Sequence, residues 1–508
     1  MKTEKSTIHY FLKNCKIFPD RTAVFVDDRE YTYNELLIIV SNIRSELIMT
    51  QNNKKLIGIL TERNIYTYAS LLAIFSLGIA FVPLNGEDPV ERLAEIVSDS
   101  EIDTILVSKS NKKNVEIEAS NKKVKSIETS LINDAKIIDV IPAIEENSLA
   151  YMIFTSGSTG KPKGVPIYNK NLNSFLSFMT DKKNYQLNED DRFLEMFELT
   201  FDAFLISIVT ALSIGASFYV VPLEGVYYFN IYNLMEEKKI TFANVVPSLV
   251  TYLKPYFSEL DLPHLKYFLS GGEALSDELM SEWSKCMPNG AIENVYGPTE
   301  STIFCTSYKW HPSETKKEIY NGLMPIGKSL DNSFVLIIDE ENNVLPDGEK
   351  GEMLLCGELV TNHYWKDDKK TMESFIQIEY DDKLINGYKS GDIGFVNENK
   401  NLVFVGRVDE QVKIDGYRVE LGEVESRVKN ISNLQKIAVI TKTNEMDNLS
   451  IHLFIEDYKN DISTLSENLA KKMPSYMLPS EIHNIDKIPI TANGKNDKKK
   501  LKKLLEKI

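Results

Sequence analysis

A loop of small hydroxyls, glycines and lysines follows the apolar run that begins at Tyr151, in the stretch YMIFTSGSTGKPKGVPIYNKN. A loop that binds phosphate needs inward-pointing backbone N–H groups, hydroxyl donors and glycines that let the main chain approach closely. Residues Thr155 to Lys163 supply all three. The Walker pattern G-x-x-x-x-G-K-[ST] is absent, because Pro162 follows Gly160 and Lys161. The stretch therefore predicts a phosphate-binding loop of another kind, with a flexible solvent loop as the alternative.

Short apolar strands alternate with helical segments on both sides of this loop. The alternation predicts an α/β fold with mostly parallel, buried sheets, in which ligands bind at the carboxyl ends of the strands. The expected strands are KLIGIL, IAFVPLN, DTILVS, YMIFTS, ASFYVVP, ITFANVV, YFLSGG and AIENVYG.

Two uncharged stretches, 64–86 and 203–223, are long enough to raise the question of a membrane span. Both contain Gly and Ser near the middle and change from helical spacing to β-branched and aromatic runs. This change predicts a buried helix, a glycine stop and a buried strand in each, and no membrane insertion. The Lys- and Asn-rich segment 109–125 is typical of a solvated connection, since no aromatic residues interleave with its lysines.

The pattern changes in the last third of the chain. After Tyr320, two β runs flank Asn-Asn and Asp-Gly turns, which predicts antiparallel structure. From residue 409 onward the pattern indicates a compact unit of roughly a hundred residues, the size of a small domain. The expected domains are therefore 1–408 and 409–508.

Charge and cysteine usage exclude some partners and compartments. The net charge of −16 disfavours nucleic-acid binding, because the summed field repels phosphate backbones. The four cysteines show no CxxC spacing, and the start MKTEKSTIHYFLKN has no apolar signal segment. We expect reduced thiols and a cytoplasmic location.

The phosphate loop resembles the signature loop of AMP-forming adenylating enzymes, and further motifs of that superfamily follow in its order across nearly the whole chain. The matching motifs are YTYNEL, LGIAFVPLNGEDPVERL, FD at 201–202, NVYGPTEST, YKSGDIG, GRVDEQVKIDGYRVELGEVE, MPSYMLP and NGKNDKKKL. The resemblance implies that a carboxylate attacks the α-phosphate of ATP to give an acyl-adenylate and pyrophosphate, after which a thiol takes the acyl group. It also implies ATP and Mg²⁺ as cofactors, and a large N-terminal domain of parallel and mixed sheets with helices and a β-rich subdomain, followed by a small mobile α+β C-terminal domain.

The resemblance assigns nucleotide contacts residue by residue. Asn294 would pair with the adenine edge, and Tyr296 would offer a ring face for stacking. Thr299 would contact the α-phosphate, and Glu300 would be the Mg²⁺ contact. The full ATP-binding set implied by the resemblance is Thr155, Ser156, Gly157, Ser158, Thr159, Gly160, Lys163, Gly272, Glu273, Asn294, Val295, Tyr296, Gly297, Pro298, Thr299, Asp392, Gly406 and Arg407.

Lys495, in NGK, matches the lysine that bridges the substrate carboxylate and the phosphate ester oxygen in the family. It is the expected catalytic residue, and a solvated lysine in a basic tail is the alternative. Asp409 falls at the hinge of the family's small domain. Rotation there would withdraw Lys495 and turn KIDGYRVELGE toward the thiol entrance.

Asp202 matches the aspartate that amino-acid-activating members use to pair with the substrate ammonium; its alternative role is to cap the helix that follows. The expected side-chain pocket is uncharged, which disfavours charged substrates. Asn244 offers it one polar contact. The expected amino-acid site is Asp202, Ala203, Ile206, Asn244, Leu269, Gly271, Val295, Ile303 and Phe304.

These features predict a free-standing ligase that activates a neutral amino acid and transfers it to the phosphopantetheine thiol of a separate peptidyl or acyl carrier protein. The D-alanine–carrier protein ligases of teichoic acid modification are one alternative, although Gly271 stands where they usually have cysteine. An acyl- or aryl-CoA ligase of the same superfamily is another. An inactive nucleotide-binding regulator is the alternative outside enzymes.

Overall fold

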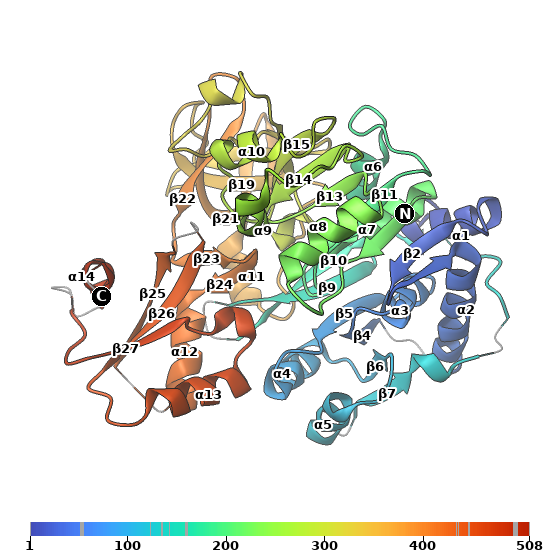
Figure 1. Ribbon diagram of the computed structural model, residues 1–508, viewed down its shortest axis with the longest axis horizontal. Helices are drawn as coiled ribbons and strands as arrows, with labels where there is room; N and C mark the ends of the chain where they lie inside the picture. The colour runs from blue at the N-terminus through green and yellow to red at the C-terminus, as the bar shows by residue number, and fades with distance from the viewer. Residues whose placement is uncertain are drawn as a thin grey trace.

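The structure is a computed structural model that describes residues 2–50, 55–121, 123–133, 136–141, 143–157, 161–432, 434, 436–444, 448–490 and 496–506. Helices pack on mixed sheets along most of the chain, and the last hundred residues extend to one side (Figure 1). The predicted α/β class is confirmed. The α-helices are α1 Thr7–Ile17, α2 Tyr33–Thr50, α3 Ile65–Phe75, α4 Val90–Ser100, α5 Lys112–Ser120, α6 Asn169–Thr180, α7 Phe204–Ile214, α8 Tyr227–Glu237, α9 Pro247–Leu253, α10 Asp277–Trp283, α11 Asp368–Ser374, α12 Leu421–Ser432, α13 Ile462–Lys472 and α14 Lys498–Leu505.

Two sheets contain the strands that the sequence predicts. The first has six strands in the order β10-β9-β5-β4-β6-β7, parallel except for β10 against β9. The second has nine, in the order β17-β16-β15-β14-β13-β11-β12-β2-β3, with a parallel centre and antiparallel edges. The strands are β2 Thr22–Val26, β3 Arg29–Thr32, β4 Leu56–Thr61, β5 Ala80–Asn85, β6 Thr104–Val107, β7 Lys125–Glu128, β9 Leu149–Thr155, β10 Lys163–Tyr168, β11 Arg192–Glu195, β12 Ser217–Val220, β13 Phe242–Asn244, β14 Tyr267–Gly271, β15 Ala291–Tyr296, β16 Thr306–Lys309 and β17 Lys328–Ser329; β1 Lys2–Thr3 pairs with β8 Ile144–Glu145 outside them.

Both long uncharged stretches form a buried helix, a glycine and a buried strand, as predicted. Asn64 caps α3 by accepting from the N–H groups of Tyr66 and Thr67, and Gly78 turns the chain into β5 with φ of 65°. Gly215 ends α7 in the left-handed conformation, where φ is 82°, and β12 follows. In the described part of the chain, no helix has the length and apolarity to cross a membrane.

The segment 109–125 differs from the prediction of a solvated connection, because it contains α5. Asn111 and Asn114 form a reciprocal capping box at the start of this helix, and Ile117 is buried beneath it. The asparagine cap and the buried Ile117 stabilise this helix, which the lysine- and asparagine-rich sequence did not predict.

The predicted antiparallel region is a five-stranded sheet in which β18 Ser333–Ile338, β19 Gly351–Gly357, β21 Lys383–Val396 and β20 Phe375–Tyr380 are neighbours in this order, and β22 Leu402–Arg407 pairs with β21. Residues 411–506, here called the C-terminal unit, form their own sheets. One is the hairpin of β23 Gln411–Ile414 and β24 Tyr417–Glu420, and the other joins β25 Ile437–Thr443, β26 Leu449–Glu456 and β27 Glu481–Ile485. Two hydrophobic clusters draw their members from this unit alone.

Candidate active site

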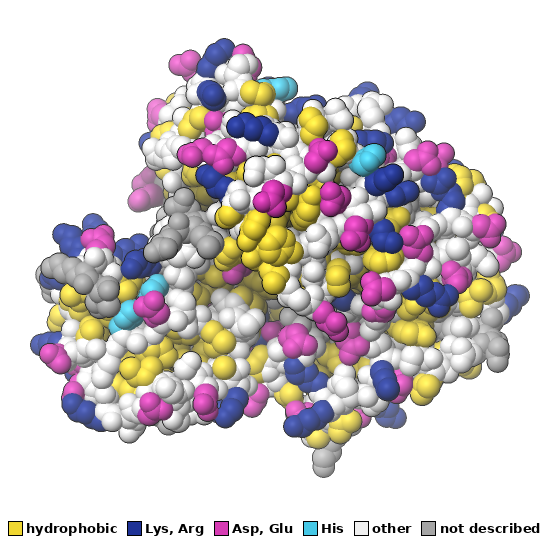
Figure 2. Space-filling view, in the orientation of Figure 1, with side chains coloured by type: hydrophobic (Ala, Val, Ile, Leu, Met, Phe, Trp, Pro, Cys, Tyr) yellow, Lys and Arg dark blue, Asp and Glu magenta, His cyan; other side chains and the backbone are white. Residues whose placement is uncertain are grey.

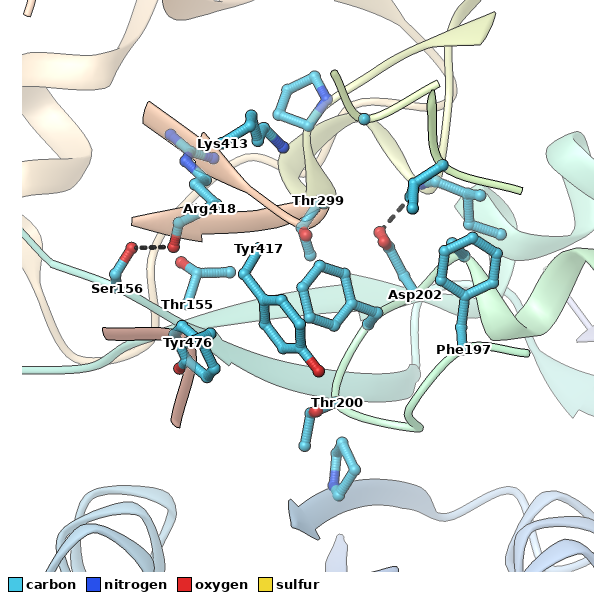
Figure 3. A pocket seen from close by; sticks show the side chains of 18 of the residues that line it. Thr155, Ser156, Phe197, Thr200, Asp202, Thr299, Lys413, Tyr417, Arg418 and Tyr476 are labelled. Atoms are coloured by element: carbon cyan, nitrogen blue, oxygen red, sulfur yellow. Dashed lines mark hydrogen bonds between the residues drawn. The ribbon is translucent and has the colours of Figure 1, made fainter. Parts of the chain in front are cut away.

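One cavity of about 120 Å³ is lined by both halves of the predicted site (Figure 3). Thr155 and Ser156 reach it from the end of β9, and Asp202 reaches it from the turn before α7. Thr299 lines the same space. Hydroxyl donors and a carboxylate therefore share one cleft at the carboxyl end of a strand, as the sequence predicts for a ligand site in an α/β fold.

The carboxylate of Asp202 is buried and does not cap α7. The helix begins after Ala203, for which no side-chain capping bond forms. Instead, Asp202 Oδ2 accepts the backbone N–H of Ile303 at 3.1 Å. Burial raises the pKa of Asp202 to about 6. A buried carboxylate with one backbone donor retains capacity for a cationic partner.

The Ile303 N–H reaches Asp202 through an unusual backbone conformation. Thr302 has φ of 57° and Ile303 has φ of 76°, although both are β-branched. Such residues rarely enter the left-handed region, and strain of this kind is concentrated at functional sites. Sequence patterns do not reveal this conformation.

Most of the expected amino-acid pocket lines the cavity. Leu269 does not: it is fully buried on β14, two residues before Gly271, and belongs to the core. The predicted residues that line the cavity with Asp202 are Ala203, Ile206, Asn244, Gly271, Val295, Ile303 and Phe304. All seven are uncharged.

A second, larger cavity of about 580 Å³ adjoins the first, and both are lined by Gly272, Val295 and Pro298. Asn294 Nδ2 donates to the carbonyl of Pro325 at 2.9 Å, which orients its amide. The Tyr296 hydroxyl donates to Asp392 Oδ2 at 2.5 Å. The predicted nucleotide residues that line this cavity are Gly272, Glu273, Asn294, Val295, Tyr296, Gly297, Pro298, Asp392, Gly406 and Arg407.

Arg407 lines the second cavity and binds Asp409, the predicted hinge residue. Its Nη1 is ion-paired with Asp392 Oδ1. Its Nε and Nη2 donate to the two carboxylate oxygens of Asp409 at 2.7 and 2.9 Å, a bidentate fork. Arg407 therefore joins the predicted hinge residue Asp409 to Asp392, a residue of the predicted ATP-binding set.

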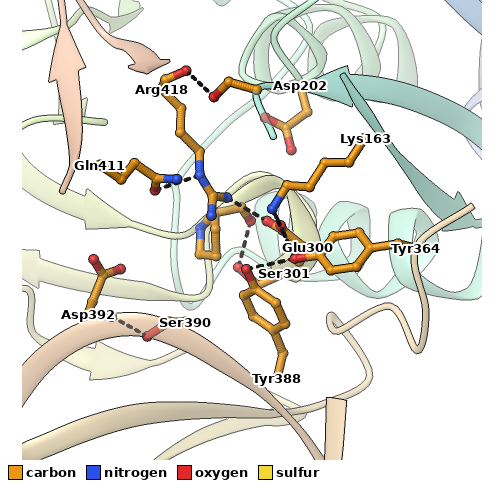
Figure 4. Close-up of polar contacts among 12 residues, drawn as sticks. Lys163, Asp202, Glu300, Ser301, Tyr364, Tyr388, Ser390, Asp392, Gln411 and Arg418 are labelled. Atoms are coloured by element: carbon orange, nitrogen blue, oxygen red, sulfur yellow. Dashed lines mark hydrogen bonds and ion pairs between the residues drawn. The ribbon is translucent and has the colours of Figure 1, made fainter. Parts of the chain in front are cut away.

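Glu300 lies at the centre of a charged cluster (Figure 4). Its Oε1 accepts from Lys163 Nζ at 3.2 Å and from the Tyr364 hydroxyl at 2.7 Å, and its Oε2 accepts from Arg418 Nη1 at 2.8 Å. Burial opposes ionisation, but Arg418 and Lys163 hold the pKa of Glu300 well below its ordinary range. Burial also lowers the pKa of Lys163 to about 8. Lys163 thus contacts Glu300, and the cluster carries an ionised carboxylate.

Part of the glycine loop is described. Ser156 Oγ donates to the carbonyl of Arg418 at 2.7 Å, and the Gly157 N–H donates to Glu423 Oε2 at 3.1 Å. A Cβ at Gly157 would lie 2.2 Å from the Lys161 carbonyl oxygen, so this close approach requires glycine. Ser158, Thr159, Gly160 and the expected catalytic Lys495 lie outside the described residues.

Comparison with known proteins agrees with these features. The family model "AMP-binding enzyme" matches residues 11–365. The chain belongs to the AMP-binding enzyme family. This membership confirms the predicted class, an ATP-dependent AMP-forming ligase.

The relatives of this AMP-binding enzyme include longer synthases, of which the chain spans only part. It is 29% identical to tyrocidine synthase 1 of Brevibacillus parabrevis over 98% of its own length, and it spans 45% of that relative. Its fold is similar to that of the Vibrio cholerae adenylation domain AlmE in complex with glycyl-adenosine-5'-phosphate, with a TM-score of 0.87, 24% identity and coverage of 100% and 99% of the two chains. It is also similar in fold to PA1221, described as containing adenylation and PCP domains, with a TM-score of 0.84, 23% identity and coverage of 98% and 84%.

Sequence reasoning missed the part of the AMP-binding enzyme's site that the C-terminal unit supplies. Lys413, Tyr417, Arg418 and Tyr476 all line the first cavity. The resemblance placed residues 413–423 at the thiol entrance and gave none of them a contact in the site, yet residues 411–420 form a hairpin that lines the first cavity. The Asp-Gly pair at 415–416 could have predicted this hairpin from the sequence. Both residues have positive φ, as a two-residue hairpin turn requires.

The hairpin is fixed in the site by contacts of its backbone and its charges. The Gly416 N–H donates to Glu273 Oε1 at 2.6 Å, and Arg418 Nη1 donates to Glu300 Oε2 at 2.8 Å. Lys413 lies opposite Arg418 in the hairpin register. Burial, reinforced by Arg418, lowers the pKa of Lys413 to about 8. Two basic side chains thereby enter the region between the cavities.

Replacing Gly271 by alanine should destabilise this AMP-binding enzyme. An added Cβ would lie 2.1 Å from the carbonyl oxygen of Val295, its partner on the neighbouring strand, so β14 and β15 would have to separate. Overpacking of this kind costs about 1–3 kcal/mol. Chemical denaturation of G271A measures the loss. G406A is the matched control, because a Cβ there meets nothing within 4 Å. Equal stability of the two variants would contradict the prediction.

Proposed function

We propose that the protein activates a neutral amino acid with ATP, forms aminoacyl-AMP and pyrophosphate, and transfers the aminoacyl group to the phosphopantetheine thiol of a separate carrier protein. The observation that carries this proposal is the shared cavity of Thr155, Ser156 and Asp202. In this cavity, a carboxylate that can pair with the substrate ammonium lies near the hydroxyls of the predicted phosphate loop. Such positioning supplies the in-line geometry that adenylation needs.

The character of the cavity wall supports a neutral substrate. The seven lining residues of the predicted amino-acid pocket are uncharged, and a charged side chain among them would lose hydration without gaining a partner. The structurally similar AlmE is in complex with glycyl-adenosine-5'-phosphate, which is an aminoacyl-AMP of a neutral amino acid. Gly271 weighs against the D-alanine alternative, because those ligases usually have cysteine there, whereas an added Cβ in this chain would lie 2.1 Å from the Val295 carbonyl oxygen.

We propose two domains, 1–408 and 409–508, with the hinge at Asp409. The separate clusters of the C-terminal unit support this division. With the hairpin 411–420 in the site, the orientation corresponds to the one that the family resemblance assigns to thiol transfer. The cavity reaches Arg92 and Tyr476 between α4 and the C-terminal unit, and we propose that the carrier's thiol arm enters there. Lys495 would enter only after the hinge rotates.

We propose Glu300 as the Mg²⁺ contact during adenylation. Its ionised carboxylate is a suitable ligand, since Mg²⁺ prefers one or two carboxylates together with substrate phosphates. In the observed orientation, however, three donors occupy both of its oxygens. Arg418, which the C-terminal unit supplies, would have to withdraw first. When bound, Mg²⁺ would neutralise negative charge on the substrate phosphates.

We also propose a cytoplasmic location, because all four cysteines are free and buried.

The test is amino-acid-dependent exchange of labelled pyrophosphate into ATP, with both enantiomers of the common amino acids, benzoates and short fatty acids as substrates. We expect exchange with one neutral amino acid, followed by its transfer to a separately expressed carrier protein. Exchange with D-alanine alone would favour the teichoic acid ligases. Exchange with only aryl or fatty acids would favour a CoA ligase and would overturn the role of Asp202.

Activation of the amino acid should depend on pH through Asp202. Its pKa of about 6 lies above the ordinary value of 3.8, so the carboxylate that pairs with an ammonium is lost as the pH falls through 6. We expect kcat/KM for the amino acid to fall about tenfold per pH unit below that value. Exchange rates at limiting amino acid between pH 5 and 8 measure it. A flat profile through pH 5 would contradict the assignment.

A further inference from the structure

Two histidines and a glutamate converge on one face of the C-terminal sheet, away from the active site. His452 lies on β26, while Glu481 and His483 lie on β27. The strands are parallel, with His452 opposite Glu481 and Phe454 opposite His483, so all these side chains share a face. In Figure 2, histidine side chains lie beside an acidic one at the surface of this unit.

The candidate ligand atoms are already close together. His452 Nδ1 lies 3.0 Å from His483 Nε2, and Glu481 Oε2 lies 3.8 and 3.5 Å from these two nitrogens. In a tetrahedral zinc site with Zn–N distances of about 2.0–2.1 Å, neighbouring ligand atoms are about 3.3 Å apart. Movement of a few tenths of an ångström would complete such a site, and the Glu481 side chain is 62% exposed and free to adjust.

A chain of hydrogen bonds orients the buried histidine. The Ser450 hydroxyl donates to the carbonyl of Lys442 at 3.0 Å, so its oxygen accepts from His452 Nε2–H, also at 3.0 Å. His452 Nδ1 therefore carries a lone pair, and it faces the other two groups. Metal-binding histidines are commonly oriented in this way by a partner on the second nitrogen.

Neighbouring side chains pack around the candidate ligands. The His483 ring stacks on Phe454, with 4.8 Å between the ring centroids. Lys442 opposes a cation here, but its Nζ donates to the carbonyl of Leu505, and the Glu481 carboxylate supplies opposite charge.

We propose that His452 Nδ1, His483 Nε2 and the Glu481 carboxylate bind one Zn²⁺, with water in the fourth position. His483 would bind as the tautomer that carries its proton on Nδ1. The ion would link β26 to β27, which is one of the two edge strands of this three-stranded sheet. The inference is independent of the proposed amino-acid activation, because the ligands lie on the C-terminal sheet and none of them lines either active-site cavity.

Equilibrium dialysis of the full chain against micromolar Zn²⁺, without nucleotide or Mg²⁺, tests the site. We expect about one zinc per chain, an X-ray absorption spectrum with two histidine nitrogens and a carboxylate oxygen, and a zinc-dependent rise in melting temperature. H483Q and E481Q should lose this binding. S450A should keep it with about 10–100-fold weaker affinity, because it removes only the orienting partner.

The control is H264Q, which removes an exposed histidine elsewhere in the chain. It should bind zinc as the unsubstituted protein does. Substoichiometric zinc in the unsubstituted protein would overturn the proposal and would leave His452 and His483 as a hydrogen-bonded pair. Binding that H483Q and E481Q leave unchanged would also overturn it, because the zinc would then be held elsewhere.

Discussion

Replacing Asp202 by asparagine should reduce kcat/KM for the amino acid about 10²–10³-fold. The variant keeps the shape of the side chain and an oxygen for the Ile303 N–H, but it removes the buried charge that the substrate ammonium would pair with. Removing one partner of a buried charge pair costs about 2–5 kcal/mol. Pyrophosphate exchange at limiting amino acid measures the loss.

Measuring the stability of D202N distinguishes the expected loss of activity from misfolding. The pKa of Asp202 is raised in the folded protein, so its contribution to stability is fully present below the unfolded pKa and is lost as the pH rises through about 6. At pH 7 the D202N variant should therefore be at least as stable as the original protein. D139N, at a carboxylate that is 79% exposed, should leave both exchange and stability unchanged. Full exchange activity in D202N would contradict the proposed ammonium site.

Replacing Lys495 by alanine should slow adenylate formation about 10²–10³-fold, the usual effect of losing one preorganised donor to developing charge. Thioester formation from a supplied aminoacyl adenylate should change little. The hairpin 411–420 lines the first cavity, where we propose that this step occurs, whereas Asn496, the described residue next to Lys495, donates from Nδ2 to the carbonyl of Ile437 on the C-terminal sheet.

The two half-reactions are measured separately, by pyrophosphate release and by loading of the carrier protein. K503A, which removes an exposed lysine on α14, controls for the loss of positive charge near this end of the chain. Equal losses of both half-reactions in K495A would remove the specific role of this lysine in adenylation.

The expected fold followed from local patterns. Continuous apolar runs of four to seven residues separated by helical spacing became the parallel strands of two sheets, and a glycine follows α3 and ends α7 near the predicted places. The prediction for the segment that forms α5 was wrong, because its lysines dominate the pattern while a single buried Ile117 and an asparagine cap stabilise the helix.

The candidate site likewise contains some residues that motif order predicted and others that only tertiary packing placed. Motif order placed Thr155 and Asp202 in one cleft, and the structure agrees. Leu269 was expected at the pocket because of its place in a motif, but the depth of β14 puts it in the core. Arg418 received no individual role, although it is the strongest charged neighbour of Glu300.

By itself, the sequence determined the α/β class, and it predicted the phosphate loop, the uncharged pocket residues and the acid at position 202, because each depends on residue types a few positions apart. Only the tertiary structure decided that Glu300 pairs with Arg418, that Asp202 accepts from Ile303, and that two histidines meet Glu481. Arg418 is 118 positions from Glu300, and Ile303 is 101 from Asp202. Contacts over such separations depend on how sheets and units pack, which local propensity does not encode.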